Sequence, residues 1–427
     1  MRRMTSNFFF LAATAALLLP CVAVGYPLDG YPNTGITRVE GFRIAQKNSG
    51  GKVLPPGANL TTDEIVLSLQ YLPDFQIPPA DPAFNRMLRE AVGSDVGGYG
   101  IALLDISDPN HPRYGEVNPN AMMNAGSVGK ILVALGFFQT LADIEPDVTK
   151  RRDLLREHVV VADEFIRTDS HDVPVFEIGG KKVTRRPLQE GEQLTLYTFL
   201  DHMMSPSSNA AASVLGREAV LMQEFGKSYP RSYEEGRAYL NSASKGRLGG
   251  QLKAVLQEPV GRNGLNRGRL RQGSLFTKEG KKRLPGASSY ASARSLMEYL
   301  VAMEKGQLVD PWSSKEIKKL LYVTDRRVRY ASAPELRDSA VYFKSGSLYR
   351  CRPERGHVCE KYHGNVWNYL ASVAVVEEPE RNPPLRYMVV ILSNVLRKNA
   401  AEEHKRLGTR IQEFMEQLHP EKSVATR

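Results

Sequence analysis

A serine and a lysine three positions apart are the first residues in this sequence whose types and spacing could do chemistry. Ser127 and Lys130 belong to the run Ser127-Val128-Gly129-Lys130, at the start of a long apolar stretch. Residues three apart lie on one face of a helix, so the hydroxyl and the amine would be neighbours. An apolar environment disfavours the ammonium and lowers the pKa of a lysine. The pair is therefore a candidate nucleophile with its base, at a helix start whose dipole would favour an oxyanion.

The same spacing occurs twice more in the chain, in Ser49 with Lys52 and in Ser242 with Lys245. Both pairs lie in Gly-rich or basic polar stretches, and no apolar helix follows them. Because nothing there would desolvate the amine, we treat both pairs as chance.

Two other short patterns could complete a site with the first pair. Ser207-Ser208-Asn209 lies between two predicted helices, where on its own it would be an ordinary N-cap run. Lys344-Ser345-Gly346 ends a predicted strand, and its glycine would let a substrate backbone lie against the strand edge. Each pattern is weak alone. Their order, at helix starts and a strand end, indicates one site.

The elements that must position these residues follow from hydrophobic periodicity. Residues 127–142 predict a helix that is apolar nearly all round, which is typical of a helix buried in a core. Further helices are predicted over 81–95, 194–204, 209–222, 290–304 and 401–418, and strands over 99–106, 114–117, 339–344, 367–377 and 386–393. Helices fill the middle and strands come from both ends, which predicts an α/β fold with an antiparallel sheet formed by N- and C-terminal segments plus a helical subdomain.

The N-terminus has the pattern of a secretory signal peptide over residues 1–25. Arg2 and Arg3 precede the apolar run 8–19, and Ala23-Val24-Gly25 is a small-x-small cleavage site. The alternatives are an uncleaved anchor and a lipoprotein attached at Cys21. Because no later segment has eighteen apolar residues in a row, we expect a periplasmic or secreted protein with no stable membrane span after cleavage.

Cleavage would remove one of the three cysteines and leave Cys351 and Cys359. An oxidising compartment favours pairing of two thiols this close in sequence, so a disulfide is expected. Two cysteines alone do not make a zinc site, although His357 and His363 lie nearby. No metal and no cofactor are expected.

Composition divides the chain further and excludes some classes. The 427 residues are 42% hydrophobic, which excludes a disordered chain, a collagen and a coiled-coil rod, and a net charge of +10 does not argue for nucleic acid. We expect an N-terminal extension over 26–80, one domain over 81–418 and a tail over 419–427.

Within the domain, 225–290 carries fourteen Lys and Arg against four Glu. This basic insertion is either a solvated, loop-rich segment or a surface for anionic cell-wall polymers or lipid headgroups.

The three patterns resemble the S-x-x-K, S-D-N and K-T-G set of the serine β-lactamase and penicillin-binding protein superfamily, in its class A β-lactamase-like branch. The likeness runs from about Asp81 to Leu418, and the segment 291–306 resembles the helix that follows the omega loop of class A enzymes. The resemblance implies that Ser127 is the acylated nucleophile, Lys130 its proton partner and Ser207 a proton shuttle to the leaving nitrogen.

The resemblance also implies a set of substrate-binding residues. Asn209 would hold the amide side chain of the substrate, Lys344 would attract its carboxylate, and Ser345 would hydrogen-bond that carboxylate. The backbone N–H groups of Ser127 and Ser347 would form the oxyanion hole. The loop between Cys351 and Cys359 would border the site and shape access to it.

The sequence departs from the family pattern at three places. Ser208 replaces the middle Asp of S-D-N, and Ser345 replaces the Thr of K-T-G. The third departure concerns the deacylating Glu of the omega loop, whose position falls near Phe276 by counting. Glu258, in a stretched echo of E-P-x-L-N, and Glu279 are the two candidates for that base. Without it, an acyl-enzyme would form on β-lactams but hydrolyse slowly.

The sequence thus predicts a secreted serine hydrolase of class A β-lactamase type that opens β-lactam amide bonds through an acyl-serine intermediate. One alternative is a D,D-carboxypeptidase or transpeptidase-like enzyme acting on D-Ala-D-Ala cell-wall peptides. The other is a non-catalytic cell-wall binding protein on the same fold. The run Asp169-Ser170-His171-Asp172 is read as a polar turn rather than part of a Ser-His-Asp arrangement.

Overall fold

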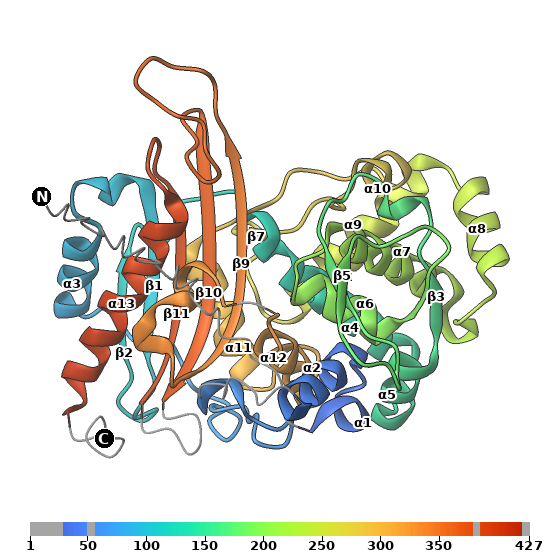
Figure 1. The fold of residues 1–427 in the computed structure, drawn as a ribbon, viewed down its shortest axis with the longest axis horizontal. Helices are drawn as coiled ribbons and strands as arrows, with labels where there is room; N and C mark the ends of the chain where they lie inside the picture. Colours follow the sequence, from blue (N-terminus) through green and yellow to red (C-terminus); the bar gives the residue numbers. More distant parts are fainter. Residues whose placement is uncertain (1–28, 49–55, 326, 379–384, 421–427) are drawn as a thin grey trace, which may run out of the picture.

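The computed structural model describes residues 29–48, 56–325, 327–378 and 385–420. The predicted signal peptide 1–25 and most of the predicted tail lie outside these residues. The helices are α1 Gly30–Thr34, α2 Thr37–Asn48, α3 Pro82–Val92, α4 Lys130–Ile144, α5 Val148–Glu157, α6 Leu196–Met204, α7 Asn209–Phe225, α8 Tyr233–Ser242, α9 Lys245–Arg262, α10 Lys278–Arg283, α11 Ala293–Glu304, α12 Pro311–Tyr322 and α13 Ala400–Leu418. Figure 1 shows a sheet with α3 and α13 on one side of the molecule and the helices from α4 to α10 on the other.

The sheet has five antiparallel strands in the order β2-β1-β11-β10-β9. Its strands are β1 Tyr99–Asp105, β2 Arg113–Val117, β9 Ala340–Arg350, β10 Trp367–Glu378 and β11 Leu385–Asn394. Strand β1 pairs with β11, so that Ile101 lies opposite Ile391. The prediction of an antiparallel sheet built from both ends of the chain, beside a helical part, is confirmed.

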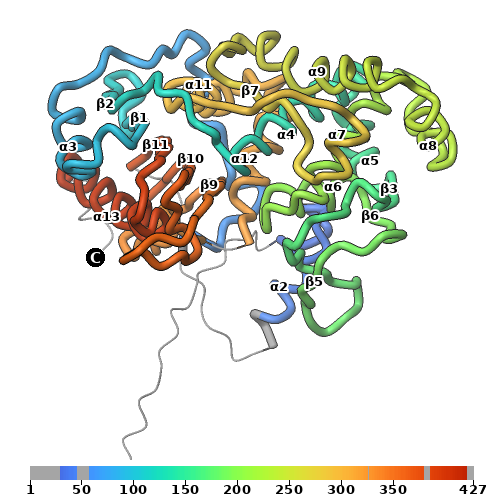
Figure 2. Tube along the Cα trace, turned by 90° about the horizontal axis from the view of Figure 1, so that it is seen from above, coloured from blue at the N-terminus to red at the C-terminus, as the bar shows by residue number. Residues whose placement is uncertain are grey.

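The sheet is buried on both faces because its strands are apolar on both faces. Ile101 and Leu103 contribute to the core under α3 and α13, whereas the alternate residues Ala102 and Leu104 contribute to the larger core that includes α11 and α12. Successive side chains of a strand point to opposite faces, so a continuous apolar run serves two layers. Figure 2 shows α13 and the sheet strands lying side by side, seen from above.

Helix α4 is the centre of the helical part. All its residues from Lys130 to Leu141 are buried, and it packs between α7 and α9. The predicted helix 127–142 is confirmed with one difference, because Gly126–Gly129 forms a separate 3₁₀ turn ahead of it. The stretch Gly126–Ile144 is also long and apolar enough to cross a membrane, but 78% of that window is buried inside the protein, as expected for a core helix.

The basic segment 225–290 differs from the loop-rich insertion that was one expectation. It forms α8, α9, α10 and the short strands β7 Leu270–Arg271 and β8 Tyr290–Ala291. Helix α9 buries Leu252 and Val255. A side chain at Gly136 of α4 would come within 2.1 Å of the Val255 carbonyl oxygen, so the two helices touch closely. The loop-rich prediction is therefore wrong, because α9 supplies part of the core.

Several arginines of this segment are neutralised by acidic residues. Arg247 pairs with Glu224 at 2.9 Å, and Arg283 pairs with Glu164 at 2.7 Å. Less of the basic charge is therefore free than the sequence count indicates. An anionic partner for 225–290 stays a prediction.

The described part of residues 26–80 is built into the core. Arg38 of α2 is buried, and its guanidinium donates to both carboxylate oxygens of Asp201 in α6 at 2.7 and 2.6 Å. The same guanidinium donates to the Val323 carbonyl oxygen, just after α12, at 2.5 Å. Leu60 and Ile65 are fully buried. This segment therefore joins two helices that flank the site. Residues 26–28 and 49–55 lie outside the described residues.

The remaining strands form small two-stranded antiparallel sheets beside the helical part. Strands β3 Val159–Val161 and β6 Gln193–Thr195 pair with each other, as do β4 Val173–Val175 and β5 Thr184–Arg186. None of these strands was predicted from the sequence, and neither were α5 and α12. The segment between β3 and β4 nevertheless reaches the site, as described below.

Candidate active site

Ser127 lies in the tight 3₁₀ turn that precedes α4, and the turn depends on two glycines. Gly126 has a φ of 53°, a conformation that suits glycine, and its N–H donates to Asn124 Oδ1 at 2.9 Å. Across the turn lies Gly346 of β9, where a Cβ would come within 2.4 Å of the Ser127 nitrogen. The glycine of Lys344-Ser345-Gly346 therefore lets the strand lie against the serine turn, a role that the sequence did not indicate.

Lys130 begins α4 and is fully buried beside the serine. Its Nζ lies 3.0 Å from Ser127 Oγ, 2.6 Å from the Ser207 carbonyl oxygen and 2.8 Å from Asn209 Oδ1. Burial lowers the pKa of Lys130 to about 7, although the charge of Asp169 opposes this shift. An amine that is partly neutral near neutral pH and lies next to a hydroxyl can act as a general base.

Ser207 connects two lysines. Its Oγ lies 3.2 Å from Lys130 Nζ and accepts a hydrogen bond from Lys344 Nζ at 2.8 Å. Ser207 has a φ of 68°, a strained conformation for serine that is often found at functional sites. Burial lowers the pKa of Lys344 well below its usual value, and the charges of Lys130 and Arg329 lower it further. A hydroxyl between two such amines can pass a proton.

The structure thus brings together all three patterns that the sequence singled out. They meet at one cavity of about 400 Å³, whose walls include Ser127, residues 204–207 after α6 and residues 343–347 of β9. None of the described residues lining this cavity is an aspartate or a glutamate.

Arg329 belongs to the same cavity and was not found from the sequence. Its guanidinium donates to Ser345 Oγ at 2.8 Å, to Ser347 Oγ at 3.1 Å and to Tyr362 Oη at 3.0 Å. Ser345 and Ser347 are two apart on β9, so their side chains point to the same side. With Lys344, these groups form a cationic, hydroxyl-lined recess that suits a carboxylate. A lone arginine in a loop gives no signal in the sequence.

Asp169 is a second residue of the site, in the run that the sequence analysis interpreted as a polar turn. Its Oδ2 accepts hydrogen bonds from Ser208 Oγ and the Ala210 N–H, both at 2.8 Å. Its other oxygen lies 2.6 Å from His171 Nδ1, and His171 lines the cavity. The turn predicted to be merely polar therefore belongs to the site. It also supplies the carboxylate that Ser208 lacks by comparison with S-D-N.

Comparison with known proteins decides the family of this fold and site. A model described as the β-lactamase enzyme family matches residues 83–384. The chain belongs to the β-lactamase enzyme family. Its fold is similar to that of serine β-lactamases and penicillin-binding proteins, and the predicted class A-like fold is confirmed.

Solved structures agree with this family at the level of the fold. PBP-A matches with a TM-score of 0.51 and 12% identity, covering 80% of this chain and 100% of that chain. A β-lactamase from Chitinophaga pinensis matches with a TM-score of 0.51 and 14% identity, covering 79% and 100%. The TLA-3 extended-spectrum β-lactamase matches with a TM-score of 0.50 and 10% identity, covering 78% and 98%. No curated protein gives a significant match.

For a member of the β-lactamase enzyme family, the most informative position is that of the predicted deacylating base. The ring of Phe276 lies beside Lys130, with its centroid 4.8 Å from Nζ. The position at which the deacylating Glu was expected is therefore next to Ser127 and Lys130, but an apolar ring occupies it. A phenyl ring cannot accept a proton from water, and it adds to the desolvation of Lys130.

The structure does not bring Glu258 to the site. It is exposed on α9, one turn before Arg262, which pairs at 2.6 Å with Asp143 near the end of α4. Asp143 lies thirteen residues after Lys130, which is about 20 Å along a helix. Glu258 therefore cannot hold a water beside Ser127, and the sequence echo that suggested it is corrected by the position of α9.

Glu279 is not brought to the site either. Its carboxylate lies 3.7 Å from Lys282 Nζ and 3.6 Å from Arg283 Nε within α10, and it does not line the cavity. Neither sequence candidate for the deacylating base therefore reaches Ser127 in this family member.

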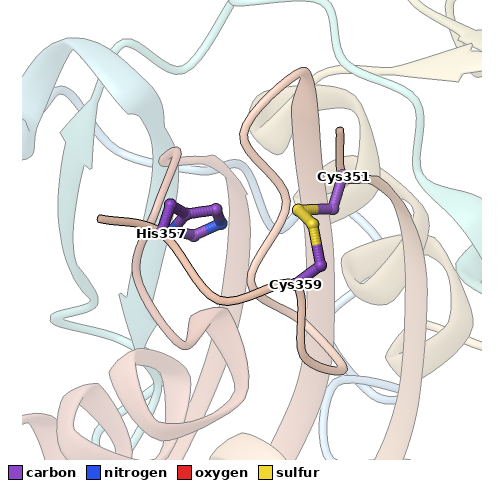
Figure 3. Close-up of side chains that lie close together, drawn as sticks. All are labelled: Cys351, His357 and Cys359. Carbon is purple, nitrogen blue, oxygen red and sulfur yellow. A yellow bond between two sulfur atoms is a disulfide. The ribbon is translucent and has the colours of Figure 1, made fainter. Parts of the chain in front are cut away.

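The predicted disulfide between Cys351 and Cys359 is confirmed, with a Cα–Cα distance of 5.7 Å. Figure 3 shows His357 facing it across the loop, and His357 Nε2 lies 2.8 Å from the His363 carbonyl oxygen. Ligand atoms of the two cysteines and His357 lie within 4.8 Å of one another, but the intact disulfide leaves no thiolate to bind a metal. Tyr362, which contacts Arg329, lies three residues after Cys359 in the same connection between β9 and β10.

Proposed function

We propose that this protein is an acyl-serine enzyme of the penicillin-binding type that acts on peptides ending in D-Ala-D-Ala and is acylated by β-lactams. The observation that carries this proposal is the 3.0 Å contact between Ser127 Oγ and the buried Lys130 Nζ, in a cavity lined by no described carboxylate. The contact supports acylation of the serine. The missing carboxylate supports slow release of a β-lactam from it.

Acylation begins with the neutral amine of Lys130. It accepts the proton of Ser127 as Oγ attacks the carbonyl carbon of the scissile amide. The backbone N–H groups of Ser127 and Ser347 receive the oxyanion. The proton then passes from Lys130 through the Ser207 hydroxyl to the leaving nitrogen, and the C–N bond breaks. Acyl-Ser127 and a free amine are the products, and Lys130 is neutral again.

Substrate recognition rests on the cationic recess of β9. The terminal carboxylate of the peptide, or the ring carboxylate of a β-lactam, would bind Lys344, Ser345 and Arg329. Asn209 accepts from Lys130 through Oδ1 at 2.8 Å, which leaves its amide N–H groups to hold the substrate carbonyl. Gly346 keeps the strand close enough to the Ser127 turn for both ends of the substrate to be reached.

The choice between the two enzymatic hypotheses depends on the second half of the reaction. Efficient β-lactam hydrolysis, the first hypothesis, needs a base that activates water beside acyl-Ser127. Phe276 lies where that base is expected. Glu258 lies on α9, near the end of α4 that is far from Ser127. We therefore favour the D,D-peptidase alternative. The buried and complete pair of Ser127 with Lys130 disfavours a purely binding protein.

We also propose that the chain is exported to the periplasm or the medium. The Cys351–Cys359 disulfide supports an oxidising compartment. N-terminal sequencing of the mature protein should begin at Tyr26, and a protein that retains Met1 would contradict cleavage.

Covalent labelling with a fluorescent penicillin tests the proposed function. The wild type should be labelled, and the label should persist through a chase with unlabelled antibiotic. Ser127→Ala should abolish labelling without loss of fold, since it removes one hydroxyl. Ser242→Ala is a matched control, because Ser242 begins a chance serine–lysine pair on the surface of α8. Rapid loss of the label would indicate a β-lactamase, and absence of labelling would indicate a binding protein.

A further inference from the structure

His171 and Asp169 form a pair at the site that the proposed acylation chemistry does not use. His171 Nδ1 lies 2.6 Å from Asp169 Oδ1. The His171 side chain is 40% exposed, whereas that of Asp169 is 5% exposed. A histidine whose Nδ1–H is donated to a carboxylate presents the lone pair of Nε2 on its other side. The pair thus has the form of an oriented base.

The carboxylate of this pair is held firmly in place. Asp169 Oδ2 accepts from Ser208 Oγ and the Ala210 N–H at 2.8 Å each. Burial on its own would raise the pKa of Asp169, but the hydrogen bonds from His171, Ala210 and Ser208 lower it to about 2. Asp169 is therefore ionised and tied to the residue that follows Ser207. The two groups that hold Asp169 in place, Ser208 Oγ and the Ala210 N–H, therefore belong to the site.

His171 is also the one histidine among the described residues that line the cavity, which it shares with Ser127 and Ser207. The amines of Lys130 and Lys344 already contact Ser207 Oγ, and the guanidinium of Arg329 does not act as a base. Lys130 already serves Ser127 and Ser207 in acylation, so His171 is a proton acceptor in this cavity that acylation does not use. The incoming acceptor must use the space that the leaving amine vacates, next to that serine. The amine of an opened β-lactam ring stays attached to the acyl group and keeps this space occupied, so the penicilloyl group is still released slowly.

We propose that His171, oriented by Asp169, is the general base that activates the acyl acceptor, a water or an amine, in the second half-reaction. The inference rests on the proposed function, because it needs acyl-Ser127. It assigns His171 a catalytic role and Asp169 a positioning role.

The step balances as a simple acyl transfer. His171 Nε2 takes the proton of the acceptor as its oxygen or nitrogen bonds to the carbonyl carbon of acyl-Ser127. The tetrahedral intermediate collapses, and the bond from that carbon to Ser127 Oγ breaks. The proton passes from His171 through the Ser207 hydroxyl and the Lys130 amine to Ser127 Oγ. Free serine and a hydrolysed or transferred acyl group are the products.

The experiment compares two reactions of the full-length mature protein. Labelling by a fluorescent penicillin reports acylation. Release of D-alanine from a D-Ala-D-Ala peptide, with intact-mass detection of the peptidyl-enzyme, reports the complete cycle. His111→Ala is a matched control, because His111 makes a similar pair with Asp108 at 2.8 Å on the surface, with the histidine 85% exposed.

We expect His171→Ala to label at the wild-type rate but to turn the peptide over about 10²-fold more slowly, with accumulation of peptidyl-enzyme. Added imidazole should restore part of the turnover, which a structural defect would not allow. Asp169→Asn should lower turnover by a smaller factor. His111→Ala should behave as the wild type.

Unchanged turnover in His171→Ala would overturn the inference and leave the proposed function intact. A parallel loss of labelling and turnover without imidazole rescue would also overturn it, because His171 would then be structural. A wild type that neither labels nor releases D-alanine would overturn the proposed function, and the inference with it.

Discussion

Two fully buried lysines in different regions of this molecule have opposite electrostatic surroundings. Lys318 of α12 lies under the sheet, where Nζ is 2.8 Å from both Glu304 Oε1 and Glu377 Oε1. The hydrogen-bond partners described for Lys130 are hydroxyl, carbonyl and amide oxygens, none of them a carboxylate. Burial lowers the pKa of both amines, but the two carboxylates raise that of Lys318 above its usual value, whereas that of Lys130 falls to about 7.

The comparison shows that burial alone does not make a lysine reactive. A buried ammonium with carboxylate neighbours is a structural cation, and removing one partner leaves uncompensated charge. A buried amine without such neighbours loses its proton more readily and becomes a base. In this protein no described carboxylate is in hydrogen-bond contact with Lys130 Nζ, and the charge of Asp169 only partly opposes the effect of burial. The following predictions test that distinction.

The largest effect is expected from Lys130→Met. Removal of the base should lower the rate of penicillin labelling by about 10³-fold. The melting temperature should stay the same or rise, because an amine that is costly to bury is replaced by an apolar chain. Labelling kinetics and thermal unfolding check both parts. A strongly destabilised variant that labels normally would reverse the roles assigned to the two lysines.

Lys318→Met should act in the opposite manner. The change leaves Glu304 and Glu377 buried without their cation, which should cost about 3–5 kcal/mol of unfolding free energy. The folded fraction should still be labelled at the wild-type rate. Denaturant unfolding measures the first effect, and labelling per folded molecule measures the second. A stable Lys318→Met protein would contradict the structural role of this ion cluster.

Phe276→Glu should make the surroundings of Lys130 resemble those of Lys318. A carboxylate in place of the ring, whose centroid lies 4.8 Å from Nζ, should raise the pKa of Lys130 and shift labelling to higher pH. It should also release the penicilloyl group about 10 to 10² times faster, since a base then faces the acyl-enzyme. Phe276→Gln is the uncharged control. Equal release by both variants would contradict the explanation of slow turnover.

The last prediction concerns the pH dependence of the wild type, which needs no substitution. Because burial lowers the pKa of Lys130 to about 7, labelling should rise about tenfold per pH unit below that value and level off above it. The same shift makes folding more stable as pH rises above about 7, since the unfolded lysine keeps its proton until a higher pH. Lys318 acts differently, because its raised pKa means that its stabilising contribution is lost only in strongly alkaline solution. Stopped-flow labelling from pH 5 to about 9 checks the first part.

Much of the fold could be predicted from local patterns. The apolar run after Ser127, the strands at both ends and the helix over 401–418 were visible because each element repeats its hydrophobic residues at its own period. The helices α8 and α9 were missed because their many basic residues resemble a solvated segment. The buried side chains of α9 face α4 and α7, and Gly236 of α8 lies against Leu221 of α7; the local sequence identifies none of these partners.

The residues of the site also fall into two groups, those that the sequence indicated and those that it did not. Ser127, Lys130, Ser207 and Lys344 could be found because they lie in short motifs of recognisable order. Arg329 could not, since a lone arginine becomes informative only through what it contacts. Asp169 and His171 were considered and interpreted as a polar turn, because the sequence does not show that this turn reaches Ser208. Glu258 was misplaced because similarity to a short motif says nothing about which end of a helix it occupies.

The sequence by itself determined which chemical groups this protein has and in which order they occur, because residue type and hydrophobic period are local properties. The tertiary structure decided which of those groups lie together and what charge each of them bears. A pKa depends on burial and on neighbours within a few ångströms, and those neighbours come from distant parts of the chain. Lys130 and Lys318 are the same residue type in buried helices, and only the fold distinguishes the base from the structural cation.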